Sequence, residues 1–72
     1  MQRFAGHQLR QARKSAGQVK ERAALMVGRS YSTITLYESG RVIPPAPIMC
    51  RLADLYGCKV EEFFEEADRV AS

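Results

Sequence analysis

Apolar residues recur every three or four positions along most of the chain, which is the spacing of one face of an α-helix. Glycine or proline residues stand between each such segment and the next, where helices typically end. The pattern predicts five short helices, over residues 4–16, 19–27, 32–39, 47–56 and 60–67. We therefore expect an all-α domain in which each amphipathic helix turns its apolar face toward one core.

The segment Ser30–Gly40 fits two patterns at once. Its serine, threonine and tyrosine residues favour a strand, whereas three of its large residues are spaced three apart like one face of a helix: Tyr31, Ile34 and Tyr37. No other segment offers a partner strand, and an isolated strand would leave its backbone groups unpaired. We predict a helix over Ser32–Ser39, with Ser30 or Ser32 as its N-cap and Gly40 as the residue that ends it.

The chain has 72 residues, of which 46% are hydrophobic and 26% charged, and this balance predicts one folded domain over residues 1–72. It contains neither an apolar run long enough to cross a membrane nor a signal peptide, so we expect a cytoplasmic protein without a membrane partner. Its cysteines, Cys50 and Cys58, and its one histidine, His7, do not match a zinc site. We expect reduced thiols, no metal and no cofactor.

Positive charge is concentrated in the first half of the chain. Residues 1–41 carry eight lysines and arginines and two glutamates, a balance of +6, whereas residues 42–72 carry three basic and six acidic residues, a balance of −3. This uneven distribution favours a protein that turns its basic side toward a polyanion such as a nucleic acid. A mixed-charge surface that faces only solvent is the alternative that charge alone leaves open.

Several motifs together resemble the Cro and phage-repressor type of helix-turn-helix protein, in the xenobiotic-response-element family. They cover about residues 4–66 and keep the family's spacing without a gap: "LRQARKSAG" at 9–17, "AALMVG" at 23–28, "STITLYESGR" at 32–41, Pro44, and "RLADLYGCKVEEFF" at 51–64. The resemblance implies a compact five-helix, lambda-repressor-like DNA-binding domain. Its second and third helices, about residues 19–39, would form the helix-turn-helix.

The resemblance also implies a buried ion pair between the first helix and the end of the third, for which the matching residues are Arg13 and Glu38. The alternative is a solvated contact of little energetic value. This chain departs from the family at the start of the second helix, where Gln18, Val19 and Lys20 replace the usual leucine, capping serine and glutamine. Lys20 is expected to take over the phosphate contact of that glutamine as a point charge.

In this family the third helix, about Ser30–Ser39 here, lies in the major groove of DNA. The positions that match its base contacts are Tyr31, Ser32, Thr35 and Leu36, and those that match or neighbour its phosphate contacts are Gln18, Lys20, Arg29, Ser30 and Arg41. Packing between helices is the alternative role of Tyr31. None of the base-contacting candidates offers the bidentate contact of arginine with guanine or of asparagine with adenine. We therefore expect modest direct readout, supplemented by DNA shape.

Proteins of this family usually bind near-palindromic sites as twofold dimers. The apolar last helix is the predicted dimer interface, formed by Val60, Phe63, Phe64 and Ala67, with Val70 beyond. Two adjacent aromatic residues cannot share one helix face. We therefore expect one of Phe63 and Phe64 to point into the core and the other to be partly available to a partner.

The sequence favours a stand-alone, sequence-specific transcriptional regulator that binds double-stranded DNA as a homodimer. Its small size suits a Cro-like phage repressor, a restriction–modification controller or a regulator borne on a plasmid or other mobile element. The alternative is an antitoxin-like module of the same fold whose main partner is a protein, bound through an apolar surface such as Met26, Val42, Ile43 and Phe64. An enzyme is not expected, because no nucleophile–base pair stands in a catalytic pattern.

Overall fold

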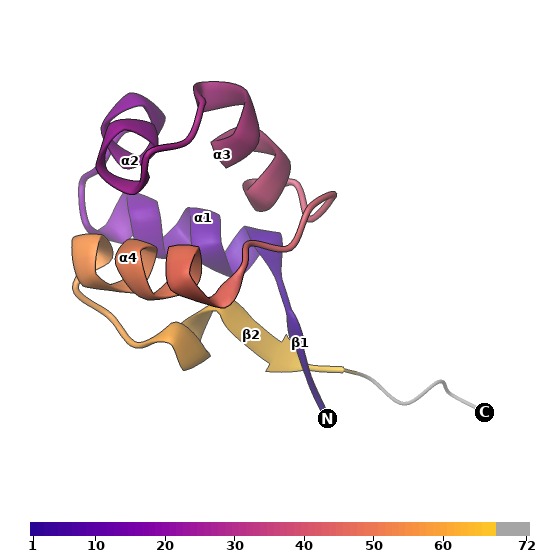
Figure 1. The fold of residues 1–72 in the computed structure, drawn as a ribbon. Helices are drawn as coiled ribbons and strands as arrows, with labels where there is room; N and C mark the ends of the chain where they lie inside the picture. The colour runs from indigo at the N-terminus through magenta and orange to yellow at the C-terminus, as the bar shows by residue number, and fades with distance from the viewer. Residues whose placement is uncertain (68–72) are drawn as a thin grey trace.

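Residues 1–67 fold into four α-helices, one 3₁₀-helix and a two-stranded antiparallel sheet (Figure 1). The computed structural model describes residues 1–67. The elements follow one another as β1 Gln2–Phe4, α1 Gly6–Ser15, α2 Lys20–Val27, α3 Tyr31–Glu38, α4 Ala46–Tyr56, η1 Val60–Phe63 and β2 Phe64–Glu66. The first and last elements pair with each other, so the two ends of the described chain lie together.

The five helical segments enclose one core. Each contributes one of the largest fully buried side chains, which are Leu9, Val27, Ile34, Leu52 and Phe63. Burying an apolar side chain of this size stabilises the folded state by roughly 1.5–3 kcal/mol. Helix α1 contacts α3, α4 and η1, and Gly6 at its start lies so close to α3 that an added Cβ would come within 2.5 Å of the Glu38 carbonyl oxygen. Only glycine fits there, and this close approach places the start of α1 against the end of α3.

The predicted helix within Ser30–Gly40 is confirmed, and it begins at Tyr31. Ser30 is the N-cap, because its hydroxyl oxygen accepts a hydrogen bond from the Thr33 N–H at 3.1 Å. Gly40 follows the helix with a φ of +81°, a conformation that side chains other than glycine rarely adopt. Packing against the neighbouring helices therefore overrides the strand preference of this composition.

The prediction of five α-helices is wrong at the two ends of the chain. Residues 60–67 form one 3₁₀-helical turn and then strand β2, which pairs with β1. Phe4 lies opposite Phe64 with the ring centroids 6.1 Å apart, and Arg3 donates to the Glu65 carboxylate at 3.1 Å. A helix over residues 60–67 would be too short to be stable by itself. The strand is favoured because it gains these cross-strand contacts with β1, which the helix would not make. The first helix likewise begins at Gly6 rather than at Phe4.

Because η1 and β2 replace the predicted last helix, the predicted dimer interface also changes. Phe63 is fully buried in the core of the monomer, so its side chain is not available to a partner chain. Phe64 is half-buried against Phe4, in line with the expectation that only one of the two aromatic rings points inward. Val60 and Ala67 are also half-buried, while Val70 lies outside the described residues.

Within residues 1–67 no helix is long and apolar enough to cross a membrane. The same residues contain no group of three or more side chains that is able to hold a metal ion.

Replacing Phe63 with alanine is expected to lower the free energy of unfolding by about 3–5 kcal/mol, because it removes the ring that closes the core. Such a loss approaches the whole stability of a domain this small. Phe64→Ala is the matched control and is expected to cost less, since the Phe64 ring is half-exposed. Urea unfolding followed by circular dichroism measures both losses, and equal losses would contradict the assignment of Phe63 to the core.

Candidate nucleic-acid interface

A buried ion pair fixes the end of α3 against α1. The Arg13 Nε donates to Glu38 Oε2 at 2.6 Å and the Arg13 Nη2 donates to Glu38 Oε1 at 3.2 Å. The third nitrogen, Nη1, donates to the Gln18 carbonyl oxygen at 2.9 Å. The hydrogen bond with Glu38 raises the pKa of Arg13, so the guanidinium stays charged at any ordinary pH. One guanidinium thus joins α1 to the end of α3 and to Gln18, two residues before α2 begins.

The two faces of α3 have different surroundings. Ile34 and Tyr37 are buried in the core and anchor the helix. On the other face Ser32 is exposed, Tyr31 is 48% exposed and Leu36 is 38% exposed. The remaining base-contacting candidate, Thr35, is half-buried at the edge of this face. The four side chains therefore lie on the side of α3 that the core leaves uncovered.

The turn before α3 brings two further candidates to its start. Gly28 has a φ of +70°, and the Arg29 N–H donates to the Ala24 carbonyl oxygen at 3.0 Å, which closes α2. Ala24 is buried, in agreement with the small residue that a close helix crossing needs. Arg29 and Ser30 are exposed at the N-terminal end of α3, where backbone N–H groups and the helix dipole favour an anion.

The start of α2 lies beside the exposed face of α3. Lys20 Nζ is 3.3 Å from Thr35 Oγ1 and 5.4 Å from the centroid of the Tyr31 ring. Val19, the N-cap of α2, makes no side-chain capping bond, as its sequence predicts. Sequence reasoning missed the contacts of Lys20, because the contacting residues lie 11 and 15 positions apart in the chain and no local pattern relates them.

Basic side chains surround α3 without carboxylate partners. Arg29 lies at its start, Arg41 just beyond its end and Lys20 beside its middle, and none of the three makes an ion pair within residues 1–67. Arg3 differs from them, because its guanidinium pairs with the Glu65 carboxylate across the sheet. Three basic residues without an ion pair in the described part of the chain thus lie where an anionic ligand would meet α3.

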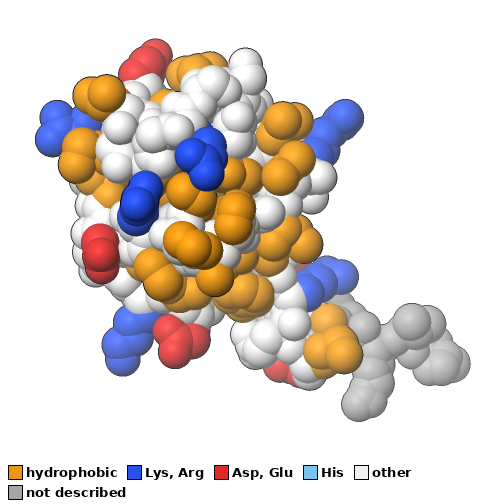
Figure 2. All heavy atoms as spheres, in the orientation of Figure 1, with side chains coloured by type: hydrophobic (Ala, Val, Ile, Leu, Met, Phe, Trp, Pro, Cys, Tyr) orange, Lys and Arg blue, Asp and Glu red, His pale blue; other side chains and the backbone are white. Residues whose placement is uncertain are grey.

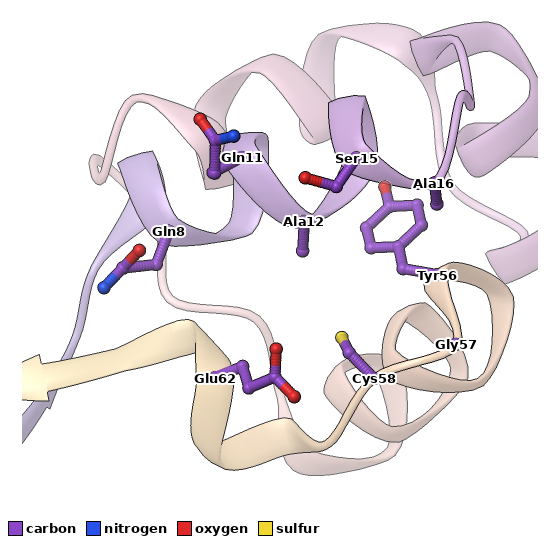
Figure 3. Close-up of a pocket in the computed structure, with 9 residues that line it drawn as sticks. All are labelled: Gln8, Gln11, Ala12, Ser15, Ala16, Tyr56, Gly57, Cys58 and Glu62. Atoms are coloured by element: carbon purple, nitrogen blue, oxygen red, sulfur yellow. The ribbon is translucent and has the colours of Figure 1, made fainter.

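A separate polar hollow of about 280 Å³ is built by α1, α4 and η1, without α3 (Figure 3). Its lining residues are Gln8, Gln11, Ala12, Ser15, Ala16, Tyr56, Gly57, Cys58 and Glu62. Burial raises the pKa of the Tyr56 hydroxyl and of the Cys58 thiol, so both groups stay protonated at neutral pH. Neither group is therefore activated as a nucleophile or a base.

Two helices joined by a glycine turn, with the second anchored on one face and exposed on the other, define a helix-turn-helix domain. Residues 5–64 match the family model described as a helix-turn-helix domain, and the chain belongs to this family of Cro- and repressor-like proteins.

The HTH-type transcriptional regulator PuuR of Escherichia coli (strain K12) is 31% identical to this chain over 64 residues. That match covers 89% of this chain and 35% of PuuR, and the protein of the same name from Shigella flexneri gives the same values. The chain thus spans about a third of the length of these curated relatives. No solved structure gives a significant match.

Replacing one partner of the Arg13–Glu38 pair is expected to lower the free energy of unfolding more than replacing both partners. Arg13→Met or Glu38→Leu alone leaves a buried charge unpaired, which costs about 3–5 kcal/mol. The double variant leaves two apolar side chains of similar volume and is expected to be more stable than either single variant. Urea unfolding of the four proteins measures this coupling. Losses that simply add in the double variant would show that the pair contributes no interaction energy.

Proposed function

We propose that this chain is a sequence-specific regulator of transcription that binds double-stranded DNA with α3 in the major groove, as a twofold dimer and as a repressor. The observation that carries the proposal is the exposed face of α3, fixed from behind by Ile34, Tyr37 and the Arg13–Glu38 pair. A helix presented in this way fits the major groove. The similarity to PuuR, which is named a transcriptional regulator, supports the same function.

The proposed base contacts are made by the exposed face of α3. The hydroxyl groups of Ser32 and Thr35 donate to or accept from the edges of several bases, and Leu36 packs on a thymine methyl group. Tyr31, at the first position of the helix, reaches a base or the adjacent sugar–phosphate. Since hydroxyl groups discriminate weakly between bases, the shape of the DNA contributes to selectivity.

The proposed phosphate contacts surround α3. Arg29 and Ser30 bind backbone phosphates at its N-terminal end, Arg41 binds one beyond its C-terminal end and Gln18 binds one at the start of α2. Contacts of this kind set the register of the protein on the duplex but carry no sequence information. They also make binding depend on salt, because each neutralised phosphate releases bound counterions.

One domain of this size contacts too few bases for useful selectivity, which is the reason for a twofold dimer on a near-palindromic site. The partly exposed residues near the last strand remain the proposed interface: Val60, Phe64 and Ala67. A dimer bound over a promoter would act as a repressor by excluding other proteins from the same DNA.

Binding to a protein, as in an antitoxin-like module, is the second candidate, and one apolar surface favours it. Figure 2 shows hydrophobic side chains gathered on the face that carries α4. Leu25 on α2 is 76% exposed. The next residue, Met26, lines a groove of about 540 Å³ between α2 and α4 together with Leu55 of α4. Apolar patches that a monomer leaves uncovered often bind other proteins.

Selection of random DNA duplexes by the purified protein tests the main proposal. We expect a common sequence with twofold symmetry, and an affinity that falls steeply with salt, with a slope of about −0.9 for each phosphate neutralised. Binding that is weak and independent of sequence would contradict a sequence-specific regulator.

The double variant Ser32→Ala, Thr35→Ala tests the proposed base contacts. It is expected to relax the selected sequence at one or two positions of each half-site, by about 1–3 kcal/mol per position, while the protein stays folded. Gln11→Ala with Ser15→Ala on α1 is the matched control. If the double variant on α3 selects the same sequence as the unaltered protein, the base-contacting face is placed wrongly.

A further inference from the structure

Helix α3 carries no side chain that recognises one base strongly by itself. Its outer face offers two hydroxyl groups, from Ser32 and Thr35, together with the Tyr31 ring and the Leu36 side chain. The strong contacts in the major groove are those in which two hydrogen bonds go to the same base, such as lysine or arginine with guanine. A donor of this kind has to come from another part of the domain.

Lys20, the first residue of α2, lies where such a donor is needed. Its ammonium group is hydrogen-bonded to the Thr35 hydroxyl at 3.3 Å and lies over the Tyr31 ring, 5.4 Å from its centroid. Tyr31 and Thr35 are four residues apart and therefore share one face of α3. The two contacts place the ammonium group over the face of α3 that meets the bases.

The carboxylate that lines the same cleft as Lys20 does not compete for this ammonium group. Glu38 and Lys20 line the same small cleft, but both Glu38 carboxylate oxygens accept hydrogen bonds from Arg13. Lys20 is half-buried, in contrast to Arg29 and Arg41, which are exposed at the two ends of α3. Its position is therefore fixed before DNA arrives, and a side chain that is already ordered loses less entropy on binding.

We propose that Lys20 reads a guanine in the major groove, in place of the phosphate contact expected from the sequence, at the base pair next to those contacted by Tyr31 and Thr35. The assignment rests on the proposed DNA-binding function. An ammonium group has three N–H donors. One of them donates to Thr35 Oγ1, and the remaining two match the two acceptors of guanine, N7 and O6. Lys20 thereby supplies the base-specific contact that α3 lacks, and it determines specificity in addition to carrying charge.

The test uses the duplex that the unaltered protein selects and a set of duplexes in which each guanine is replaced singly by 7-deazaguanine, which lacks the N7 acceptor. We expect one position in each half-site at which this replacement weakens binding by the unaltered protein about tenfold. Lys20→Gln is expected to bind the selected duplex more weakly and to lose the effect of 7-deazaguanine at that position. Arg51→Gln on α4 removes the same charge outside the interface and is the matched control, which should keep the full effect.

A loss of affinity in Lys20→Gln that is equal for all duplexes, with a salt slope reduced by about one, would show a phosphate contact and overturn the assignment. Unchanged melting temperature of the variant separates both results from a loss of folding. If the unaltered protein selects no common sequence, the proposed function fails and the assignment of Lys20 fails with it. If it selects a sequence in which no guanine responds to 7-deazaguanine, the assignment alone is wrong.

Discussion

The buried ion pair between Arg13 and Glu38 determines how the proposed recognition helix is presented. Three hydrogen bonds from one guanidinium reach the end of α3 and the chain that enters α2, so α1 fixes both helices of the motif relative to each other. Removing two charges from water is costly, and a pair of this kind adds little net stability compared with an apolar contact. We infer that its main contribution here is a defined orientation of α3.

This orientation gives the two faces of α3 separate roles. Ile34 and Tyr37 bury their side chains in the core, and Gly6 allows α1 to approach the end of the same helix closely. The opposite face keeps small hydroxyl groups and one aromatic ring in contact with solvent. A composition typical of strands therefore suits a short helix whose stability comes from packing on one side and whose other side stays exposed.

The sequence was sufficient to predict the parts of the fold that depend on local patterns. The spacing of Ile34 and Tyr37 and the positive φ of Gly28 and Gly40 follow from short-range rules, and the same rules left two candidates for the serine N-cap, of which Ser30 is the one used. The pairing of β1 with β2 was not predictable in this way, because Phe4 and Phe64 come from opposite ends of the chain and each strand has only three residues. The position of Lys20 over Tyr31 and Thr35 was missed for the same reason, since it depends on how α2 and α3 cross.

The exposed face of α3, together with the start of α2, is the proposed DNA-binding surface. Titration of the ¹⁵N-labelled protein with the duplex it selects, followed by amide chemical shifts, tests this assignment. We expect the largest changes at residues 18–20 and 29–41, with small changes around the groove of Met26 and Leu55. Changes concentrated at that groove, with α3 unaffected, would contradict it.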